Sequence, residues 1–329
     1  WATRRGLEQS TGDVVARWKA NRFAGCSHVV DLCCGIGGDT LALSQRVSNV
    51  LAVDRDPVMV WMARENAAVS GVPMPALCIA RCQDLRIDAG TVWHVDPDPR
   101  AGGKRTIDPG RMEPPRAWIA ELLERAPTGA IKLAPATRID GGWPASAEWT
   151  WISHGGECRQ LVGWFGDLAV APGGHRAVKL EQDGTAWEWL REDNGEPIPV
   201  TTHVGSLLLE LDAALLASNL AGDFLARHGL QALTSRGGYA TSEDLPEECR
   251  PWVRAYQVEA VLPLRFEAVV RWLRSSDCWV TQVKQRGAGI TAEAWLRRLV
   301  REQPEGQDRV FVATVLGKRR VAIMGREMA

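Results

Sequence analysis

Short apolar segments alternate with helix-like segments between residues 28 and 135, and this alternation constrains the fold more than any other feature of the chain. We predict strands at HVVDLCCG, NVLAVD, PALCIA, TVWHVD and GAIKLAP. We predict helices within residues 8–23, with the start near Thr11 and Asp13, and at residues 39–47, 57–70 and 115–125. Strands that alternate with helices at this spacing favour a parallel sheet covered by helices on both faces.

The pattern changes beyond this region, where two antiparallel hairpins are predicted. The segment EWTWISHGGECRQLVGWFG turns at Gly155 and Gly156, and HRAVKLEQDGTAWEWL turns at Asp183 and Gly184. Antiparallel strands added to a parallel sheet make it a mixed sheet. The stretch NGEPIPV that follows contains two prolines and a glycine, so we place the boundary of the first domain at residue 200.

Residues 201–329 are predicted to form a second, smaller α+β domain. It opens with a long helix over residues 207–228, which Gly229 closes. WVTQVKQRG follows as a strand, ITAEAWLRRLVRE as a helix, and RVFVATVLGKRRVAIMG as a hairpin that turns at Gly317 and Lys318.

The charge of the 329-residue chain is unevenly distributed. The net charge of -1 excludes a general field that attracts polyanions, but residues 284–326 hold ten basic and four acidic side chains. Eight cysteines without C-x-x-C spacing indicate a reducing, cytoplasmic location, and neither they nor the six histidines have the spacing of metal ligands. No apolar run of about 18 residues is present, so we expect no membrane span. Because the chain starts at Trp1 rather than Met, we expect native residues before it.

A glycine-rich turn, VVDLCCGIGGDT, joins the first predicted strand to a helix. Glycines here let backbone N–H groups and a helix N-terminus approach a ligand closely. Gly35 and Gly37 are followed by Thr40 where a dinucleotide fingerprint has its third glycine, and the G-K-[ST] of a phosphate loop is missing. The turn therefore fits neither of these sites, and close packing alone is the alternative explanation for its glycines.

Carboxylates follow the strand ends, at Asp31, Asp54, Asp84, Asp96 and Asp98. In an open α/β sheet, ligands bind outside the carboxyl ends of the strands, so we expect these side chains to converge on one crevice. The acid after the second strand suits a ribose diol, and the acid after the third suits an adenine amine. The acid beside the glycines suits an α-ammonium group. The set describes a nucleoside that carries an amino acid.

The segments DLCCGIGGD, AVDRDPVMVWMARENAAVSGV, DPDPRAGGKR and IKLAP resemble class I S-adenosylmethionine-dependent methyltransferases, in particular the trimethylguanosine-synthase-like branch. LLLELDAALLASNLAGDFLARHGLQAL, RGGYATSED, VTQVKQRG and GKRRVAI are similar to the THUMP-like domain that follows such a domain in bacterial proteins. The resemblance implies a Rossmann-like methyltransferase domain with a mixed seven-stranded sheet at residues 1–200, and a THUMP-like α+β domain at 201–329. It implies S-adenosylmethionine as the cofactor.

The predicted site residues follow from these segments. The expected cofactor contacts are Asp31, Cys33, Gly35, Gly37, Gly38, Asp39, Thr40, Asp54, Arg55 and Asp84. The expected catalytic residues are Asp96, Pro97 and Asp98, and the expected substrate contacts are Arg100, Lys104, Arg105, Lys284, Arg286, Arg319 and Arg320. We expect Cys33 and Cys34 to be small turn residues rather than nucleophiles.

The acceptor motif departs from its relatives. Amine-methylating relatives place an Asp or Asn, two prolines and an aromatic residue after the fourth strand, whereas this chain has DPDPR, with an extra acid and no aromatic residue. Asp96 or Asp98 is expected to accept a hydrogen bond or a proton from the methylated atom. A base role for His94 stays open. The candidates for stacking on the acceptor are tryptophans whose alternative role is core packing, namely Trp93, Trp143, Trp149 and Trp151.

Two interpretations of the basic residues stay open. Arg100, Lys104 and Arg105 suit phosphate contact, or they form a solvated loop with a salt bridge to Asp108. The C-terminal cluster suits RNA, with which THUMP-type domains are associated, or it is partly the solvated face of one helix. The function expected is methylation of a base in RNA. The alternatives are a non-catalytic binding protein on this scaffold, and a methyltransferase for small molecules or proteins.

Overall fold

The computed structural model describes residues 1–98, 108–191, 196–302 and 305–328. The predicted substrate contacts Arg100, Lys104 and Arg105 lie outside the described residues. The chain divides into two compact units, Trp1–Asp193 and Asn194–Ala329. No helix in the described residues has the length and apolar character needed to cross a membrane.

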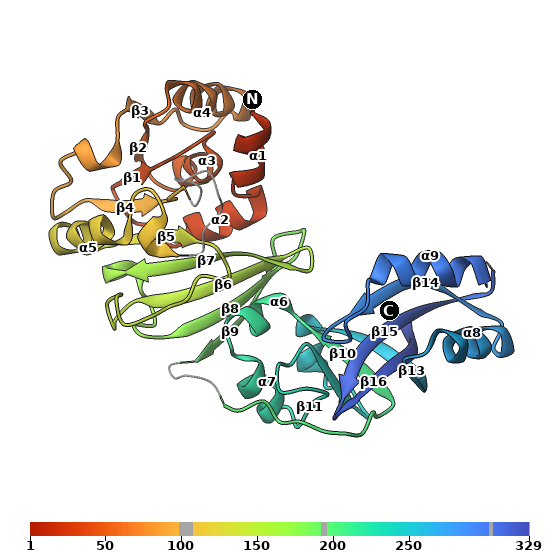
Figure 1. The fold of residues 1–329 in the computed structure, drawn as a ribbon. Helices are drawn as coiled ribbons and strands as arrows, with labels where there is room; N and C mark the ends of the chain where they lie inside the picture. Colours follow the sequence, from red (N-terminus) through yellow and green to blue (C-terminus); the bar gives the residue numbers. More distant parts are fainter. Residues whose placement is uncertain (99–107, 192–195, 303–304, 329) are drawn as a thin grey trace. The chain divides into compact units, whose positions relative to one another are not determined.

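The first unit is built on one mixed nine-stranded sheet in the order β3-β2-β1-β4-β5-β7-β6-β8-β9 (Figure 1). The strands are β1 (His28–Leu32), β2 (Asn49–Asp54), β3 (Ala76–Ile79), β4 (Val92–Val95), β5 (Gly129–Leu133), β6 (Glu148–His154), β7 (Glu157–Phe165), β8 (His175–Leu180) and β9 (Ala186–Arg191). Strands β1 to β5 pair in parallel, and β7 runs antiparallel to β5. The mixed α/β fold predicted from the sequence is confirmed.

The sheet is two strands wider than the seven expected. Strand β8 pairs in parallel with β6, and β9 pairs antiparallel with β8, so the second predicted hairpin extends the sheet beyond β6. Both predicted hairpins form, with Gly155 and Gly156 in left-handed conformations in one turn and Gly184 in the other. The number of strands predicted for this sheet is too low because an alternating pattern predicts a hairpin but does not show which sheet the hairpin joins.

Among the described residues of this unit, five α-helices accompany the sheet, α1 (Arg4–Gln9), α2 (Asp13–Asn21), α3 (Gly38–Ser44), α4 (Pro57–Ser70) and α5 (Arg116–Arg125). Helices α2 and α3 contribute Val15 and Leu43 to a core that also contains Val29, Val162 and Trp164 of the sheet. Helix α4 starts where Asp56 accepts a hydrogen bond from the Val58 N–H, and it ends at Gly71 in the left-handed conformation, as expected for capped helices.

The helix expected within residues 8–23, with its start near Thr11 and Asp13, is present as α2, which begins at Asp13, whereas α1 was not expected and the chain leaves the helical conformation between the two. Ser10 is extended at the end of α1, and Gly12 is extended at the start of α2. Between them the Thr11 hydroxyl donates to Asp39 Oδ2 at 2.6 Å. This contact holds the segment between the two helices against α3. The break brings the segment against the turn that follows β1.

The second unit contains a seven-stranded sheet in the order β11-β12-β10-β13-β16-β15-β14. Its strands are β10 (Leu207–Leu211), β11 (Gln231–Ala232), β12 (Tyr239–Ser242), β13 (Val253–Pro263), β14 (Cys278–Gln285), β15 (Gln307–Leu316) and β16 (Arg319–Glu327). Its helices are α6 (Ala213–Ala217), α7 (Ala221–Arg227), α8 (Phe266–Ser275) and α9 (Ala292–Glu302). Helices α8 and α9 pack on one face through Leu273 and Leu299, in a core with Phe311 and Met324.

The long helix expected over residues 207–228 is wrong. Its first part is β10, which pairs with both β12 and β13. Asp212 then caps α6 by accepting a hydrogen bond from the Ala214 N–H at 2.7 Å, and Asn219, with φ of 61°, separates α6 from α7. A short apolar run such as LLLEL fits a buried strand as well as a helix, so periodicity alone misassigned it. Strand β13 and helix α8 were not expected from the sequence, whereas β14, α9 and the β15–β16 hairpin were.

The C-terminal sheet curls until residues of its edge strand reach strands near its other end. Lys284 of β14 donates to Glu210 of β10, and its ammonium lies 5.7 Å from the ring centroid of Tyr256 of β13. The Arg286 guanidinium lies 5.8 Å from the ring centroid of Tyr239 of β12. Since β13, β16 and β15 separate β10 from β14, these contacts require strong curvature.

Candidate active site

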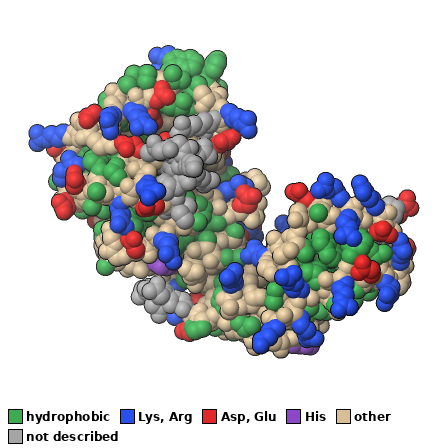
Figure 2. All heavy atoms as spheres, in the orientation of Figure 1, with side chains coloured by type: hydrophobic (Ala, Val, Ile, Leu, Met, Phe, Trp, Pro, Cys, Tyr) green, Lys and Arg blue, Asp and Glu red, His purple; other side chains and the backbone are tan. Residues whose placement is uncertain are grey.

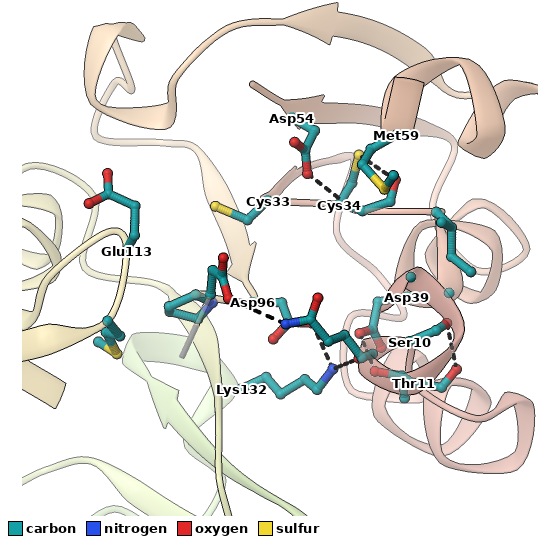
Figure 3. A pocket seen from close by; sticks show the side chains of 18 of the residues that line it. Ser10, Thr11, Cys33, Cys34, Asp39, Asp54, Met59, Asp96, Glu113 and Lys132 are labelled. Atoms are coloured by element: carbon teal, nitrogen blue, oxygen red, sulfur yellow. Dashed lines mark hydrogen bonds and ion pairs between the residues drawn. The ribbon is translucent and has the colours of Figure 1, made fainter. Parts of the chain in front are cut away.

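A cavity of about 670 Å³ lies at the carboxyl ends of the parallel strands in the first unit (Figure 3). Of the predicted cofactor and catalytic residues, it is lined by Asp31, Cys33, Gly35, Gly38, Asp39, Asp54, Arg55, Asp96, Pro97 and Asp98. Gly37, Thr40 and Asp84 are not among the lining residues. The α1–α2 segment, from Gly6 to Gly12, forms a further wall that the sequence did not indicate. In Figure 3 the carboxylate of Asp54 lies across the cavity from Asp96 and Lys132.

The end of the cavity at β2 combines exposed glycine backbone with a carboxylate held in place by backbone N–H groups. Gly35 has φ of 54°, and a Cβ built on it would meet no atom within 4 Å, so bare peptide faces open space. The Gly35 N–H donates to Asp54 Oδ2 at 2.9 Å, and the Asp56 N–H donates to Asp54 Oδ1 at 2.9 Å. Burial raises the pKa of the Asp54 carboxyl. The two backbone N–H groups fix a carboxylate with lone pairs left for a ribose diol.

Two further predicted glycines are in close packing contacts, and of these Gly38 lines the cavity whereas Gly37 does not. Gly37 has φ of 91°, and a Cβ there would lie 3.2 Å from the Cβ of Ala63, so the position expected to face a ligand contacts α4. A Cβ on Gly38 would lie 2.5 Å from the Ser10 hydroxyl oxygen, which shows how closely the α1–α2 segment approaches. The floor of the cavity is therefore bare at Gly35 but not at Gly37.

Cys33 stands directly after β1 with φ of 61°, a conformation uncommon for a residue with a side chain. A hydrogen bond with Cys82 and burial raise the pKa of the Cys33 thiol. Burial likewise raises the pKa of Cys34. The thiolate is the nucleophilic form of cysteine, so raised values favour the expected role of both as turn residues.

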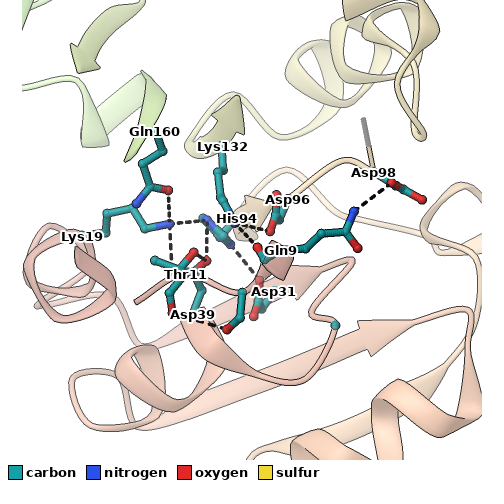
Figure 4. Close-up of polar contacts among 12 residues, drawn as sticks. Gln9, Thr11, Lys19, Asp31, Asp39, His94, Asp96, Asp98, Lys132 and Gln160 are labelled. Atoms are coloured by element: carbon teal, nitrogen blue, oxygen red, sulfur yellow. Dashed lines mark hydrogen bonds and ion pairs between the residues drawn. The ribbon is translucent and has the colours of Figure 1, made fainter. Parts of the chain in front are cut away.

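Beneath the cavity lies a buried polar network (Figure 4). The Thr40 hydroxyl donates to Asp31 Oδ2, and His94 Nδ1 lies 2.7 Å from Asp31 Oδ1. His94 is 2% exposed and does not line the cavity, and its Nε2 faces the Lys19 ammonium at 3.5 Å. A base role for His94 is therefore wrong, because the ring cannot contact an acceptor. Both Asp31 oxygens already hold protein partners, so an α-ammonium group would be a third.

Asp39 and Lys19 form the charged centre of this network, with 2.7 Å between Oδ1 and Nζ. Lys19 also donates to Gln160 of β7 at 3.2 Å. Burial alone would raise the pKa of Asp39, but the ammonium of Lys19 outweighs it and holds that pKa well below its usual range. Burial lowers the pKa of Lys19, and Asp39 opposes that change. The pair joins α2 to the helix that follows the glycine turn.

At the opposite end of the cavity the acceptor motif meets β5. The Lys132 ammonium donates to Asp96 Oδ2 at 2.6 Å and to the carbonyl of Gln9 at 3.0 Å. The Gln9 side chain donates to Asp98 Oδ1 at 3.3 Å, and Asp98 exchanges two backbone hydrogen bonds with Glu113. Burial raises the pKa of Asp96, and Lys132 opposes this rise. The predicted pair of carboxylates therefore faces the cavity together.

Sequence reasoning missed Lys132, Gln9 and Gln83 as lining residues. A signal for Lys132 existed, because a lysine inside the apolar strand GAIKLAP needs a partner. Asp84 is exposed, because the short 3-10 turn Cys82–Asp84 directs the preceding residue, Gln83, toward the cavity instead. Gln83 donates there to Glu113. The expected contact of Asp84 with adenine is thus wrong in this structure.

None of the four tryptophans considered for stacking lines the cavity, since Trp93, Trp143, Trp149 and Trp151 are all buried in the first unit. Trp143 stacks on Phe165 with 6.1 Å between ring centroids, and the Trp93 indole donates to the carbonyl of Ala126 at 2.8 Å. Their role is core packing. Within the part of the chain that the structure describes, no group of three or more His, Cys, Asp or Glu side chains is placed to hold a metal ion.

The basic residues of the second unit that are predicted to contact the substrate differ in their exposure and in their protein partners. The Lys284 side chain is 16% exposed and forms an ion pair with Glu210, so an RNA contact there would compete with Glu210 and stays a prediction. Arg286 is exposed but lies over Tyr239. Arg319 and Arg320 are exposed at the start of β16. Figure 2 shows Lys and Arg side chains spread over this unit.

Comparisons with known proteins agree with this geometry. A family model described as a methyltransferase domain matches residues 29–95, and one described as THUMP domain-like matches residues 253–327. An uncharacterized S-adenosylmethionine-dependent methyltransferase of Mycobacterium tuberculosis (strain ATCC 25618 / H37Rv) is 28% identical over 301 residues, 90% of this chain and 80% of the relative. A 23S rRNA (uracil-C5)-methyltransferase of Stenotrophomonas maltophilia (strain K279a) is 33% identical over 104 residues, 32% of this chain and 21% of the relative.

The likeness extends to a solved structure. The crystal structure of a proposed methyltransferase from Porphyromonas gingivalis W83 has a TM-score of 0.78 and 19% sequence identity, and the match covers 99% of this chain and 83% of that chain. This likeness concerns the fold of both units. The glycine turn, the carboxylate after β2 and the methyltransferase match over residues 29–95 all concern the same strands. The chain is an S-adenosylmethionine-dependent methyltransferase that carries a THUMP-like domain at its C-terminal end.

Proposed function

We propose that this methyltransferase modifies a base in structured RNA, and that the C-terminal unit holds the RNA. The observation that carries the proposal is the THUMP domain-like match over residues 253–327 beside a methyltransferase domain. The relative from Stenotrophomonas maltophilia named as a 23S rRNA methyltransferase supports it. An RNA substrate also agrees with the cytoplasmic location expected from the cysteine usage.

Within the first unit we propose a division of the cavity into two ends. Asp54 and Gly35 hold the ribose and adjoining part of S-adenosylmethionine, and Asp96, Pro97 and Asp98 hold the acceptor. The main tasks of a methyltransferase are to place the nucleophile in line with the sulfonium methyl and to exclude water. The two ends on opposite sides of one cavity suit this task (Figure 3).

The proposal is tested by transferring a tritiated methyl group from S-adenosylmethionine to cell extract that is then separated into RNA, protein and small molecules. We expect the label in RNA. Label only in protein or small molecules would favour the alternative acceptors. No label in any fraction, despite cofactor binding, would favour a binding protein without transfer activity.

The second half of the test concerns the C-terminal arginines. Replacing both Arg319 and Arg320 by Ala should weaken RNA binding and lower the slope of log affinity against log salt by about one for each phosphate that the variant no longer neutralises. The control replaces two exposed arginines of the first unit, Arg64 and Arg86, by Ala, which removes the same charge. Equal effects of the two double variants would show a general charge effect and count against the assigned surface.

A further inference from the structure

Lys132 is a largely buried cation of the cavity with two hydrogen-bond partners. It lies in β5, where its neighbours Ile131 and Leu133 are buried, and its own side chain is 15% exposed. Its ammonium donates both to Asp96 at 2.6 Å and to the Gln9 carbonyl at 3.0 Å (Figure 4). One nitrogen therefore connects the acceptor motif after β4 with the α1–α2 wall.

The charges around this contact favour an ion pair. Burial would lower the pKa of Lys132, but the carboxylates of Asp96 and Asp39 outweigh it and raise that pKa above its usual value. Lys132 is thus an ammonium at neutral pH. Burial raises the pKa of Asp96 above its usual value, and the Lys132 ammonium opposes this rise.

The groups that face Asp96 come from three other elements. Lys132 of β5 is in direct contact with it, whereas Asp39 of α3 and Lys19 of α2 act on it over a longer distance. Asp98, two residues further along the same segment, is held by the Gln9 side chain. Asp39 favours protonation of Asp96, and Lys19 is already paired with Asp39, so Lys132 is the group that keeps Asp96 ionised.

We propose that Lys132 is a positioning residue for methyl transfer. Its ammonium holds Asp96 in the ionised form, as an acceptor that faces the N–H group to be methylated. The same ammonium links Asp96 to the α1–α2 segment, which forms one wall of the cavity. The inference rests on the proposed function, in which Asp96 contacts the acceptor. Among the residues that the structure describes, Lys132 is the one that forms an ion pair with Asp96.

Methyl transfer in this arrangement needs no reactant other than S-adenosylmethionine and the acceptor. As the new N–CH₃ bond forms, the S–CH₃ bond breaks, and the sulfonium becomes a neutral thioether. The methylated nitrogen carries the positive charge until its N–H proton passes to the Asp96 carboxylate, which later releases it to water. Asp96 can accept the hydrogen bond and then the proton only while it is ionised, and an adjacent ammonium maintains that state inside the cavity.

The first experiment needs no methyl transfer. In protein labelled with ¹³C in the Asp carboxyl groups, the Asp96 signal is assigned by its loss in Asp96→Asn and titrated by NMR. We expect Lys132→Met and Lys132→Gln to shift the Asp96 midpoint upward by about one pH unit or more, because an ammonium in contact depresses a carboxyl pKa by that amount. Lys132→Arg should restore it. The matched control is Lys179→Met, which removes a lysine paired with Glu181 on β8.

The second experiment follows the rate of methyl transfer to RNA against pH. In Lys132→Met we expect kcat to fall by about 100-fold near neutral pH, a typical contribution of a positioned acid or base, and the acidic limb to move upward. A purely structural role would lower kcat equally at every pH. An Asp96 titration midpoint that is the same in wild type, Lys132→Met and Lys132→Gln would overturn the proposal. If wild type methylates no RNA, the proposed function fails, while the NMR titration still decides the role of Lys132.

Discussion

At the scale of single residues, the site depends on carboxylates that the protein keeps in a defined state. Asp54 is fixed by two backbone N–H groups, Asp39 by Lys19, and Asp96 by Lys132. Asp54 and Asp96 lie at the ends of β2 and β4 and Asp39 lies in the first turn of α3, so secondary structure determines their positions, while the partners influence their protonation. The two properties are separable by substitution.

Asp54→Asn tests the ribose assignment. The amide keeps the shape but loses the charge, so we expect the affinity for S-adenosylhomocysteine to fall by about ten- to 100-fold, the usual value of a hydrogen bond to a charged group. Isothermal titration calorimetry measures this directly. Asp88→Asn, at an exposed acid outside the cavity, is the control and should bind normally. Equal affinities for all three proteins would refute the assignment.

Asp39→Asn tests the buried pair. It leaves the Lys19 ammonium without its partner, so we expect a loss of about 3 to 5 kcal/mol in the free energy of unfolding in urea at pH 7. The double variant Lys19→Met/Asp39→Leu should lose less, since no buried charge remains. If Asp39→Asn unfolds at the wild-type urea concentration, the pair contributes little.

The same pair makes a prediction about pH. In the folded protein the pKa of Asp39 lies below its usual value of 3.8. The stability that Asp39 contributes is therefore fully present above pH 3.8 and is lost as pH falls further. We expect the difference in urea midpoint between wild type and Asp39→Asn to shrink from pH 7 to pH 3. A difference that stays constant would contradict this linkage.

At the scale of elements, the division of the N-terminal segment into α1 and α2 makes the cavity complete. Gly6 and Gly38 allow this segment to lie against the glycine turn, because a Cβ on Gly6 would come within 2.8 Å of Ile36 Cγ2. Without that approach, Gln9 would not reach Asp98 and Lys132. The segment is thus part of the site even though its sequence shows no motif.

Gly6→Val tests this role. The added side chain must displace α1, and overpacking of this kind costs about 1 to 3 kcal/mol. We expect weaker binding of S-adenosylhomocysteine and faster proteolysis within α1, with the rest of the first unit still folded. Gly90→Val is the matched control, because a Cβ on Gly90 meets no atom within 4 Å. Unchanged binding in Gly6→Val would separate α1 from the cofactor site.

At the scale of the whole molecule, features encoded by residues close together in the sequence were predictable, whereas features that depend on contacts between distant segments were not. The parallel strands, their terminal acids and helix α4 were predictable because each has its own periodicity and capping residues. The β10 strand was not, since LLLEL suits either structure until β12 and β13 pair with it. Contacts such as Gln9 with Asp98 join distant segments, and no local signal reports them.

The nine-stranded sheet also determines where the chain leaves the first unit. The chain passes out of β9, the outermost strand, so three strands, β7, β6 and β8, lie between that strand and β5, which carries Lys132. A mechanical load that enters from the C-terminal end would be borne first by the β8–β9 pairing. Separation of this outer pair would leave the pairing of β5 with β4 and β7 in place, and with it the strand that carries Lys132.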